Sequence, residues 1–229
     1  MPDSLRKVAA NVIACERCPR LRSYCKRVAQ EKRRMFQNES YWGKPVPGFG
    51  DPEACLLIIG LAPAAHGGNR TGRVFTGDRS GDWLYDALYR YGFANQPVSK
   101  HRNDGLQLKG AYVTAAARCA PPANKPERQE FANCREYLVR ELRLLPQVQV
   151  ILCLGRLALD NYLLARTGHG HSPTRPRPAF AHGAEWAAPE GVTVLCSYHP
   201  SQQNTQTGKL TRQMFHSVFS RAREICENS

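Results

Sequence analysis

Residues 55–78 read CLLIIGLAPAAHGGNRTGRVFTGD, an apolar run that leads directly into a glycine-rich loop. The run at 55–60 is short, continuous and apolar, which is typical of a strand buried on both faces of a parallel sheet. A glycine-rich loop after such a strand often binds phosphate, but this loop matches neither GxGxxG nor GxxxxGK[ST]. Its only carboxylate is its last residue, Asp78. The ligand of the loop must therefore be inferred from the rest of the chain.

Three further segments have the composition of buried strands: 111–117 (AYVTAAA), 148–154 (VQVILCL) and 192–198 (VTVLCSY). The alanine-rich segment carries the weakest strand signal. Apolar residues follow helical spacing in the stretches around them, at 81–91, 128–145, 156–166 and 207–226. This alternation predicts an α/β fold in which helices cover both faces of an open parallel sheet.

The length of 229 residues suits one domain, predicted to span 1–229 with an N-terminal helical segment over 1–50. The segments 92–109 and 167–191 are predicted as loops, and the sequence contains no repeats. No apolar run approaches the roughly 18 residues of a membrane helix. The N-terminus is too polar for a secretory signal, so we expect a soluble cytoplasmic protein with no membrane partner.

All four predicted strands lead into unusual segments at their carboxyl ends. These segments are GLAPAAHGG, RCAPPANKP, LG and SYHPSQQN. Ligands of open α/β sheets bind outside the carboxyl ends of the strands. One shared site is therefore favoured over four independent loops.

The chain carries 32 Lys and Arg against 19 Asp and Glu, a formal charge of +13. Such an excess favours a polyanionic partner, because cationic side chains that neutralise phosphates release condensed counterions. Nucleic acid is the favoured partner. A merely basic soluble protein and an anionic small-molecule substrate remain the alternatives on charge alone.

Nine cysteines in an expected cytoplasmic chain favour metal or redox use over disulfides. Cys55, Cys153 and Cys196 lie in apolar runs as core residues, and Cys25 and Cys226 lie on helical stretches without an evident partner. The remaining four are Cys15, Cys18, Cys119 and Cys134. Four thiolates suit zinc or a [4Fe–4S] cluster, and the spacing leaves both open, together with free thiols.

Four motifs in order resemble the type 5 group of the uracil-DNA glycosylase superfamily. They are the CxxC at 15–18, the loop at 60–78, CAPPANKPERQEFANC at 119–134 and HPSQQNTQTGKLT at 199–211. The resemblance covers about residues 15–216. It implies a three-layer αβα sandwich around a four-stranded parallel sheet. It also implies that Cys15, Cys18, Cys119 and Cys134 bind a structural [4Fe–4S] cluster.

By this resemblance the protein excises uracil from DNA, and also hypoxanthine and xanthine, after flipping the base into a pocket. Gly60, Ala62 and Phe75 would line that pocket, with the Phe75 ring stacked on the base. The usual superfamily aspartate is replaced by Ala62, and the resemblance assigns its role to Asp78. Two alternatives stand beside these roles: Phe75 as a core residue and Asp78 as a helix cap.

For the departing base, His199 matches the residue that contacts the base O2, with a purely structural histidine as the alternative. The base-reading asparagine of other branches is absent from 113–117, and we expect Asn124 to substitute for it. The alanines of that strand imply a roomier pocket. We therefore hypothesise that purines such as hypoxanthine and xanthine are tolerated.

The loop 201–207 matches the segment that enters the minor groove and fills the vacated stack. Polar side chains replace the usual leucine there, so Ser201, Gln203 and Asn204 are expected DNA contacts. Lys209, Arg70 and Arg73 are expected phosphate contacts. The expected partner is damaged DNA, single- or double-stranded, and the protein is expected to be a nucleoid-associated monomer.

Two other function classes compete with a glycosylase. A non-catalytic, metal-stabilised nucleic-acid-binding protein would not need Asp78, Phe75, Asn124 and His199 at strand ends. A phosphoryl-transfer enzyme or nuclease would need a P-loop lysine or clustered carboxylates for Mg²⁺, and the chain has neither. A glycosylase that uses an Asp-assisted water is therefore the predicted function.

Overall fold

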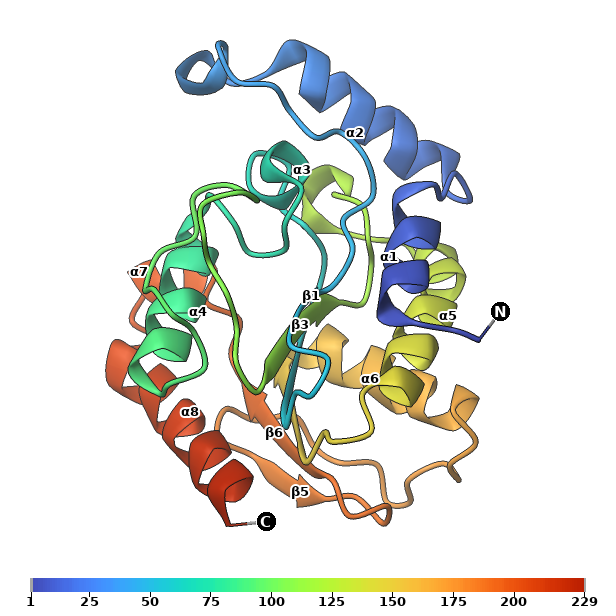
Figure 1. The fold of residues 1–229 in the computed structure, drawn as a ribbon, viewed down its shortest axis with the longest axis vertical. Helices are drawn as coiled ribbons and strands as arrows, with labels where there is room; N and C mark the ends of the chain where they lie inside the picture. Colours follow the sequence, from blue (N-terminus) through green and yellow to red (C-terminus); the bar gives the residue numbers. More distant parts are fainter. Residues whose placement is uncertain (1, 229) are drawn as a thin grey trace.

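A six-stranded sheet forms the centre of the protein in a computed structural model that describes residues 2–228 (Figure 1). The strand order is β1-β3-β2-β4-β6-β5. The strands are β1 (Phe49–Gly50), β2 (Leu56–Gly60), β3 (Ala111–Ala115), β4 (Val150–Leu154), β5 (Glu185–Ala187) and β6 (Thr193–Ser197). The four central strands β3, β2, β4 and β6 are parallel, whereas β1 and β5 pair antiparallel at the two edges.

The predicted α/β fold is confirmed, and the four predicted strands form the parallel centre of the sheet. The sheet has six strands rather than four, because β1 and β5 extend its edges. These edge strands are only two and three residues long, and their side chains are half-buried or exposed. They therefore carry no apolar run that a sequence pattern could reveal, and β5 lies inside the predicted loop at 167–191.

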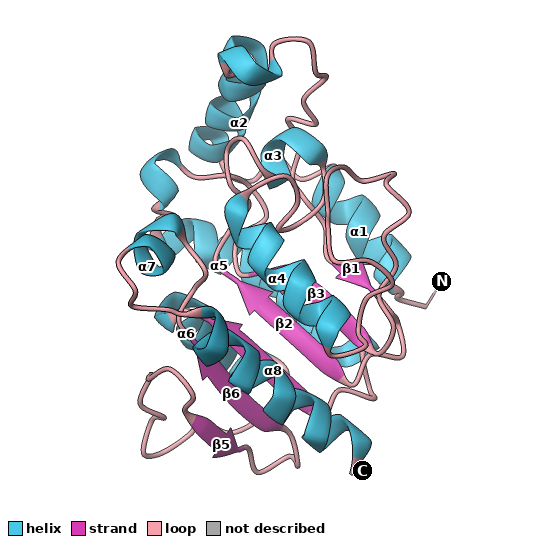
Figure 2. Cartoon of the chain, turned by 90° about the vertical axis from the view of Figure 1, so that its left-hand side faces the viewer, coloured by secondary structure: helices cyan, strands magenta, loops and turns pink. Residues whose placement is uncertain are grey.

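Helices cover both faces of the sheet (Figure 2). The α-helices are α1 (Leu5–Ile13), α2 (Pro19–Glu31), α3 (Gly68–Thr71), α4 (Arg79–Arg90), α5 (Arg128–Leu144), α6 (Arg156–Gly168), α7 (Gln202–Gln206) and α8 (Arg212–Glu227). Two short 3₁₀ helices are η1 (Arg34–Phe36) and η2 (Pro122–Asn124). None of the helices within residues 2–228 has the length and apolar character that a membrane crossing requires.

The side chains of β2 alternate between the two faces of the sheet. Leu56 and Ile58 pack in the cluster that includes α4 and α8, whereas Leu57 and Ile59 pack in the cluster that includes α5 and α6. All four side chains are fully buried. Each contributes about 1.5–3 kcal/mol relative to an exposed position, so a strand buried on both faces holds the three layers together.

The N-terminal helices lie against α5. Val8 and Val12 of α1 are buried beside Tyr137, and Arg20 of α2 forms an ion pair with Glu130 at 2.8 Å. These contacts attach the N-terminal segment to the sheet layer that α5 covers. Residues 1 and 229 of the domain predicted for 1–229 lie outside the described residues.

A buried ion pair joins the end of β3 to α5. Arg118 donates to Glu141 at 3.0 and 2.6 Å, and both side chains are 1% exposed. The Thr114 hydroxyl also donates to Glu141 at 2.8 Å. Because a buried charge is costly unless it is paired, this contact fixes where the chain leaves β3 toward Cys119.

Candidate active site

A small cavity of about 40 Å³ lies at the carboxyl end of the parallel sheet. Its wall comes from the loops after β2 and β6 and from the end of β3. The lining residues are Ala62, Pro63, Ala64, Val74, Phe75, Asp78, Ser80, Ala115 and His199. Four of the predicted site residues, Ala62, Phe75, Asp78 and His199, are thus brought together in one place.

Asp78 is both the N-cap of α4 and a wall of the cavity. Its carboxylate accepts a hydrogen bond from the Gly81 N–H at 3.0 Å. Burial raises the pKa of Asp78, although the N–H groups of Gly81 and Ser80 oppose that shift. A Cβ on Gly67 would lie 2.0 Å from Asp78 Oδ2, so the carboxylate occupies space that only a glycine leaves free. The cap role and a chemical role are therefore compatible in this residue.

His199 follows β6 and faces the cavity with a neutral ring. Burial lowers the pKa of His199 to about 4, so the imidazole is uncharged at neutral pH. Asn204 donates from Nδ2 to the main-chain oxygen of His199 at 2.8 Å, which fixes the backbone at this position. Within residues 2–228 the imidazole makes no hydrogen bond, so its ring N–H is available to a ligand.

Phe75 closes the cavity by stacking against His199. The two ring centroids are 5.7 Å apart and the planes are inclined by 28°. The Phe75 ring also lies over Gly60, where a Cβ would approach it to 2.6 Å. Phe75 has φ of 51°, a left-handed conformation that is costly for a bulky residue and that often marks a functional site.

The cavity is smaller than a nucleobase. A volume of about 40 Å³ holds water, since one water needs roughly 10–15 Å³ of such space. A planar base between Phe75 and His199 would require the two rings to separate. In this structure the cavity therefore has room for water but not for a base.

Four lining residues were not predicted: Pro63, Ala64, Val74 and Ser80. Each is a near neighbour of a predicted position between β2 and the first turn of α4, whereas Ala115 is one of the strand alanines that were expected at the pocket. Their side chains are small or apolar and carry no distinctive chemistry. The only sequence signal that could have found them is their place at strand ends.

Asn124 does not line this cavity. It lies in η2 with an exposed side chain and φ of 55°. Its backbone N–H bonds to the Pro121 carbonyl at 3.2 Å within the turn. The structure therefore does not bring Asn124 together with Asp78 and His199.

Arg70 and Arg73 lie inside the protein, 7% and 4% exposed. Arg70 forms an ion pair with Glu39 and donates to the Gly77 carbonyl at 2.9 Å. Arg73 binds both oxygens of Asp104, at 2.8 and 2.7 Å. These contacts hold the loop that forms the cavity wall and argue against the predicted phosphate contacts.

The polar residues after His199 fall into two groups, those that hold the loop and those that are exposed. Ser201 caps α7 by accepting a hydrogen bond from the Asn204 N–H at 3.3 Å, and Asn204 points back to the main chain. Gln203 is exposed. Lys209 is also exposed, with its ammonium 4.9 Å from the centre of the Tyr198 ring. Gln203 and Lys209 are therefore accessible to a large ligand, whereas Ser201 and Asn204 shape the loop.

The four predicted cysteine ligands come from three parts of the fold. Cys15 follows α1, Cys18 is the N-cap residue of α2, Cys119 follows β3 and Cys134 lies in α5. The Cys134 thiol interacts electrostatically with Cys15, Cys18 and Cys119, so the four sulfurs occupy one neighbourhood. Within residues 2–228, no three His, Cys, Asp or Glu side chains form a site for a single metal ion.

The surroundings of these cysteines fit a negatively charged iron–sulfur group. The buried Nε atoms of Arg118 and Arg135 lack a hydrogen-bond partner among the described residues, whereas Arg22 Nε lies 3.3 Å from Glu16 Oε1. Asn133 donates from Nδ2 to Cys18 Sγ at 3.4 Å. Hydrogen bonds to sulfur and nearby cations are what thiolate-bound clusters require.

Two cysteines that seemed isolated in the sequence have thiol partners. The thiol of Cys25 interacts with that of Cys119, and the thiol of Cys226 in α8 interacts with that of Cys55 next to β2. The expectation that Cys25 and Cys226 lack partners was therefore wrong. Both pairs join residues far apart in the sequence, so spacing could not reveal them.

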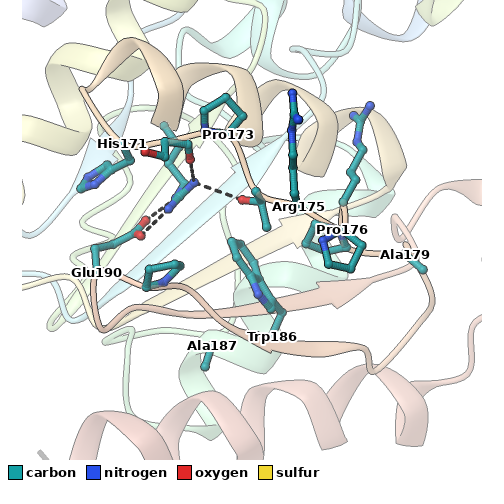
Figure 3. A pocket seen from close by; sticks show the side chains of 14 residues that line it. His171, Pro173, Arg175, Pro176, Ala179, Trp186, Ala187 and Glu190 are labelled. Carbon is teal, nitrogen blue, oxygen red and sulfur yellow. Dashed lines mark hydrogen bonds and ion pairs between the residues drawn. The ribbon is translucent and has the colours of Figure 1, made fainter.

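A second cavity, of about 840 Å³, has His171, Arg175 and Trp186 around it (Figure 3). It lies between the loop after α6 and strand β5. Among the described residues, none of the predicted site residues lines it. The Arg166 guanidinium beside it is already paired with Glu190 at 2.5 and 2.7 Å. The predicted site residues Ala62, Phe75, Asp78 and His199 line the smaller cavity instead.

Comparison with known proteins gives consistent matches. The family model described as the uracil DNA glycosylase superfamily matches residues 47–223. The chain is 51% identical to the type-5 uracil-DNA glycosylase of Thermus thermophilus over 212 residues, covering 93% of this chain and 94% of that protein. It is 46% identical to the type-5 uracil-DNA glycosylase of Mycobacterium leprae over 223 residues, covering 97% and 96%. Identity to the type-4 uracil-DNA glycosylase of Sulfurisphaera tokodaii is 25% over 224 residues, covering 97% and 85%.

Proposed function

The chain belongs to the uracil-DNA glycosylase superfamily, and from this premise we propose that it excises uracil from DNA by hydrolysing the N-glycosidic bond. The observation that carries the proposal is the cavity shared by Asp78, Phe75 and His199 at the carboxyl end of the sheet. A carboxylate, an aromatic face and a neutral imidazole are the groups that this reaction needs.

Asp78 acts on the water and on the sugar. Its carboxylate accepts a proton from a water that attacks C1′, and its negative charge stabilises the oxocarbenium-like sugar as the glycosidic bond breaks. The hydroxyl of the water ends on C1′ and the proton ends on the departing base. Burial raises the pKa of Asp78, which makes it a stronger base than an exposed carboxylate.

His199 stabilises the leaving base. As the bond breaks, negative charge develops on the uracil oxygens, and the neutral ring donates one N–H hydrogen bond to O2. Because burial holds the pKa of His199 at about 4, this donor is uncharged throughout the neutral range. The hydrogen bond from Asn204 to the His199 main chain keeps the ring directed into the cavity.

Base entry separates the Phe75 and His199 rings, after which Phe75 stacks on the flipped base. The small side chains of Ala62 and Ala115 line the wall. We extend the proposal to hypoxanthine and xanthine, because methyl groups at these positions leave an opened pocket space for a second ring. Asn124 would read the base only if η2 moved toward the cavity on DNA binding.

Cys15, Cys18, Cys119 and Cys134 would hold a structural [4Fe–4S] cluster. When bound, the cluster supplies a cross-link between the N-terminal segment, β3 and α5 rather than a step in base removal. The Nε–H groups of Arg118 and Arg135, which lack a hydrogen-bond partner among the described residues, would be free to donate toward it. Four thiolates from three separate elements make this link comparable to a set of disulfides.

The proposed partner is damaged DNA, bound by a monomer associated with the nucleoid. Arg79, directly after Asp78, and Lys209, after α7, are exposed cations that would contact phosphates. Gln203 would enter the minor groove beside the flipped nucleotide.

The proposal is tested by incubating the purified protein with duplexes that each contain one uracil, hypoxanthine or xanthine. Uracil release should leave an alkali-cleavable abasic site opposite an intact strand. Release from the other two duplexes would extend the substrate range, and their survival would restrict it to uracil. Binding of the uracil duplex without any release would favour a non-catalytic DNA-binding protein.

A further inference from the structure

The segment that joins α2 to β1 begins with a tip, which lies at the top of Figure 1. The tip consists of Lys32, Arg33, Arg34, Met35 and Phe36, with the last three forming η1. Lys32 has φ of 50°, which turns the chain sharply at the end of α2. The tip belongs to neither the central sheet nor its covering helices, and the exposed side chains of Arg33, Arg34 and Met35 take no part in the packing of the core.

Cations are paired along α2 but not at the tip. Arg20 faces Glu130 at 2.8 Å, Lys26 faces Glu16 at 3.6 Å and Arg27 faces Glu31 at 3.8 Å. Among the described residues, the exposed side chains of Arg33 and Arg34 have no acidic partner. Two adjacent guanidinium groups are thus available to an anion at the tip.

Met35 is the most exposed large apolar side chain among the described residues, at 74%. The next, Leu164 in α6, is 49% exposed. Methionine is flexible and adapts to irregular apolar surfaces, and it is one of the residues that proteins insert between base steps of DNA. An exposed methionine next to two unpaired arginines combines an apolar contact with phosphate contacts.

The tip is fixed to the wall of the cavity. The Phe36 ring lies 3.8 Å from the Arg70 guanidinium, and Arg70 in turn pairs with Glu39. The hydroxyl of Tyr41 is 3.0 Å from His66 Nδ1 and accepts from the Arg33 N–H at 3.4 Å. Burial lowers the pKa of His66, and the charge of Arg33 lowers it further. His66 and Arg70 belong to the loop after β2, so these contacts attach the tip to the loop that forms the cavity wall.

The segment after β6 borders the same carboxyl end of the sheet but offers only polar side chains. Residues 201–207 read SQQNTQT, and the exposed side chains there, Gln202, Gln203, Gln206 and Thr207, are all polar. Any apolar contact with the DNA stack must therefore come from elsewhere. The exposed Met35, tied to the loop after β2, is placed to supply it.

We propose that Arg33, Arg34 and Met35 form a second DNA-contacting element beside the cavity. The arginines contact phosphates of the duplex, and Met35 packs against sugars and base edges near the flipped nucleotide. The inference rests on the proposed glycosylase function, because it assigns DNA as the ligand of this surface. It also assigns a function to the basic residues at the end of α2.

The experiment compares Met35→Ala and the double variant Arg33→Gln/Arg34→Gln with two control variants. Leu164→Ala removes an exposed apolar side chain from α6, and Arg6→Gln/Lys7→Gln removes two exposed charges from α1. Dissociation constants for a duplex with an abasic-site analogue are measured over a range of salt concentrations. Thermal unfolding confirms that every variant is folded, as expected for exposed positions.

We expect Met35→Ala to weaken binding by roughly tenfold, as base contacts with a side chain do. The arginine variant should weaken binding and reduce the slope of log Kd against log salt by about 0.9 per lost phosphate contact. The controls should remain within about twofold of the wild type, because a twofold change is below 0.5 kcal/mol.

The inference would be overturned if the tip variants had the dissociation constants and salt slopes of the control variants. It would also be overturned if the tip variants lowered the excision rate without weakening DNA binding. Failure of the proposed function has a different signature. In that case the wild-type protein releases no uracil, whatever the tip variants do to binding. Release by the wild type together with unaltered binding by both tip variants would overturn the tip alone.

Discussion

At the scale of the residue, Asp78 combines two roles that usually compete. As the N-cap of α4 it accepts the Gly81 N–H, and as a cavity wall it lies beside His199 in a site with room for water. The hydrogen bond holds one carboxylate oxygen in place. The packing against Gly67 then limits where the other oxygen can point.

Asp78→Asn should raise the melting temperature at neutral pH. Asparagine caps helices about as well as aspartate, so the cap is preserved while a buried charge is removed. The folded pKa of Asp78 is raised above 3.8, so ionisation costs stability as pH rises through that folded pKa. Differential scanning calorimetry should therefore show a gain that vanishes at acid pH. A melting temperature below that of the wild type at pH 7 would contradict this account.

Gly67→Ala should displace the Asp78 carboxylate, because the new Cβ would lie 2.0 Å from Oδ2. A misplacement of about 1 Å in a catalytic group can cost roughly a hundredfold in rate. Steady-state kinetics should show a large fall in kcat with little change in KM. Gly168→Ala, at the end of α6, is the matched control. Equal kinetics for the two variants would show that the position of the carboxylate does not matter.

The cavity residues Ala62, Phe75, Asp78 and His199 could be predicted because each lies in a distinctive motif at a strand end. The burial of Arg70 and Arg73 could not. Their acidic partners, Glu39 and Asp104, are about 30 residues away in the sequence, and no local pattern connects them. A motif likewise does not reveal which way a loop residue faces, so Asn124 can match a motif and still lie outside the cavity.

At the scale of the element, apolar runs buried on both faces made the four parallel strands predictable. The edge strands β1 and β5 were not predictable, because they are short and make only one set of strand contacts. The ends of the central strands are where the candidate site lies. They carry the loops that form the cavity, and polar contacts rather than apolar burial fix where those loops begin.

Glu141→Gln should destabilise the protein by about 3–5 kcal/mol, because it leaves the charge of Arg118 buried and unpaired. Chemical denaturation measures the loss. Glu227→Gln is the control, since it breaks the exposed ion pair with Arg223 and should cost less than about 1 kcal/mol. Similar losses in both variants would show that the Arg118–Glu141 pair does not anchor β3 to α5.

At the scale of the whole molecule, the positions of the positive charges matter as well as their number. Many arginines are used internally, in pairs such as Arg73–Asp104 and Arg166–Glu190. The net charge of +13 is therefore a poor guide to which cations meet DNA. The exposed and unpaired cations are the informative ones.

The N-terminal segment should depend on the proposed cluster for its attachment. Anaerobically purified protein should be brown, with iron and sulfide in similar amounts. Cys134→Ser should retain less iron, whereas Cys226→Ser, away from the proposed ligands, should retain as much as the wild type. A colourless protein that contains zinc would contradict the cluster assignment.

The most direct test of the central claim is the single-turnover rate of uracil excision by the wild type and by Asp78→Asn across pH. We predict a loss of about 100-fold or more in the variant, the range of a missing general base, with binding to abasic DNA nearly unchanged. The wild-type rate should fall at acid pH as Asp78 is protonated, and the variant should lack this acid limb. An Asp78→Asn protein that excises uracil at the wild-type rate, or that loses excision and abasic-site binding equally, would contradict the account.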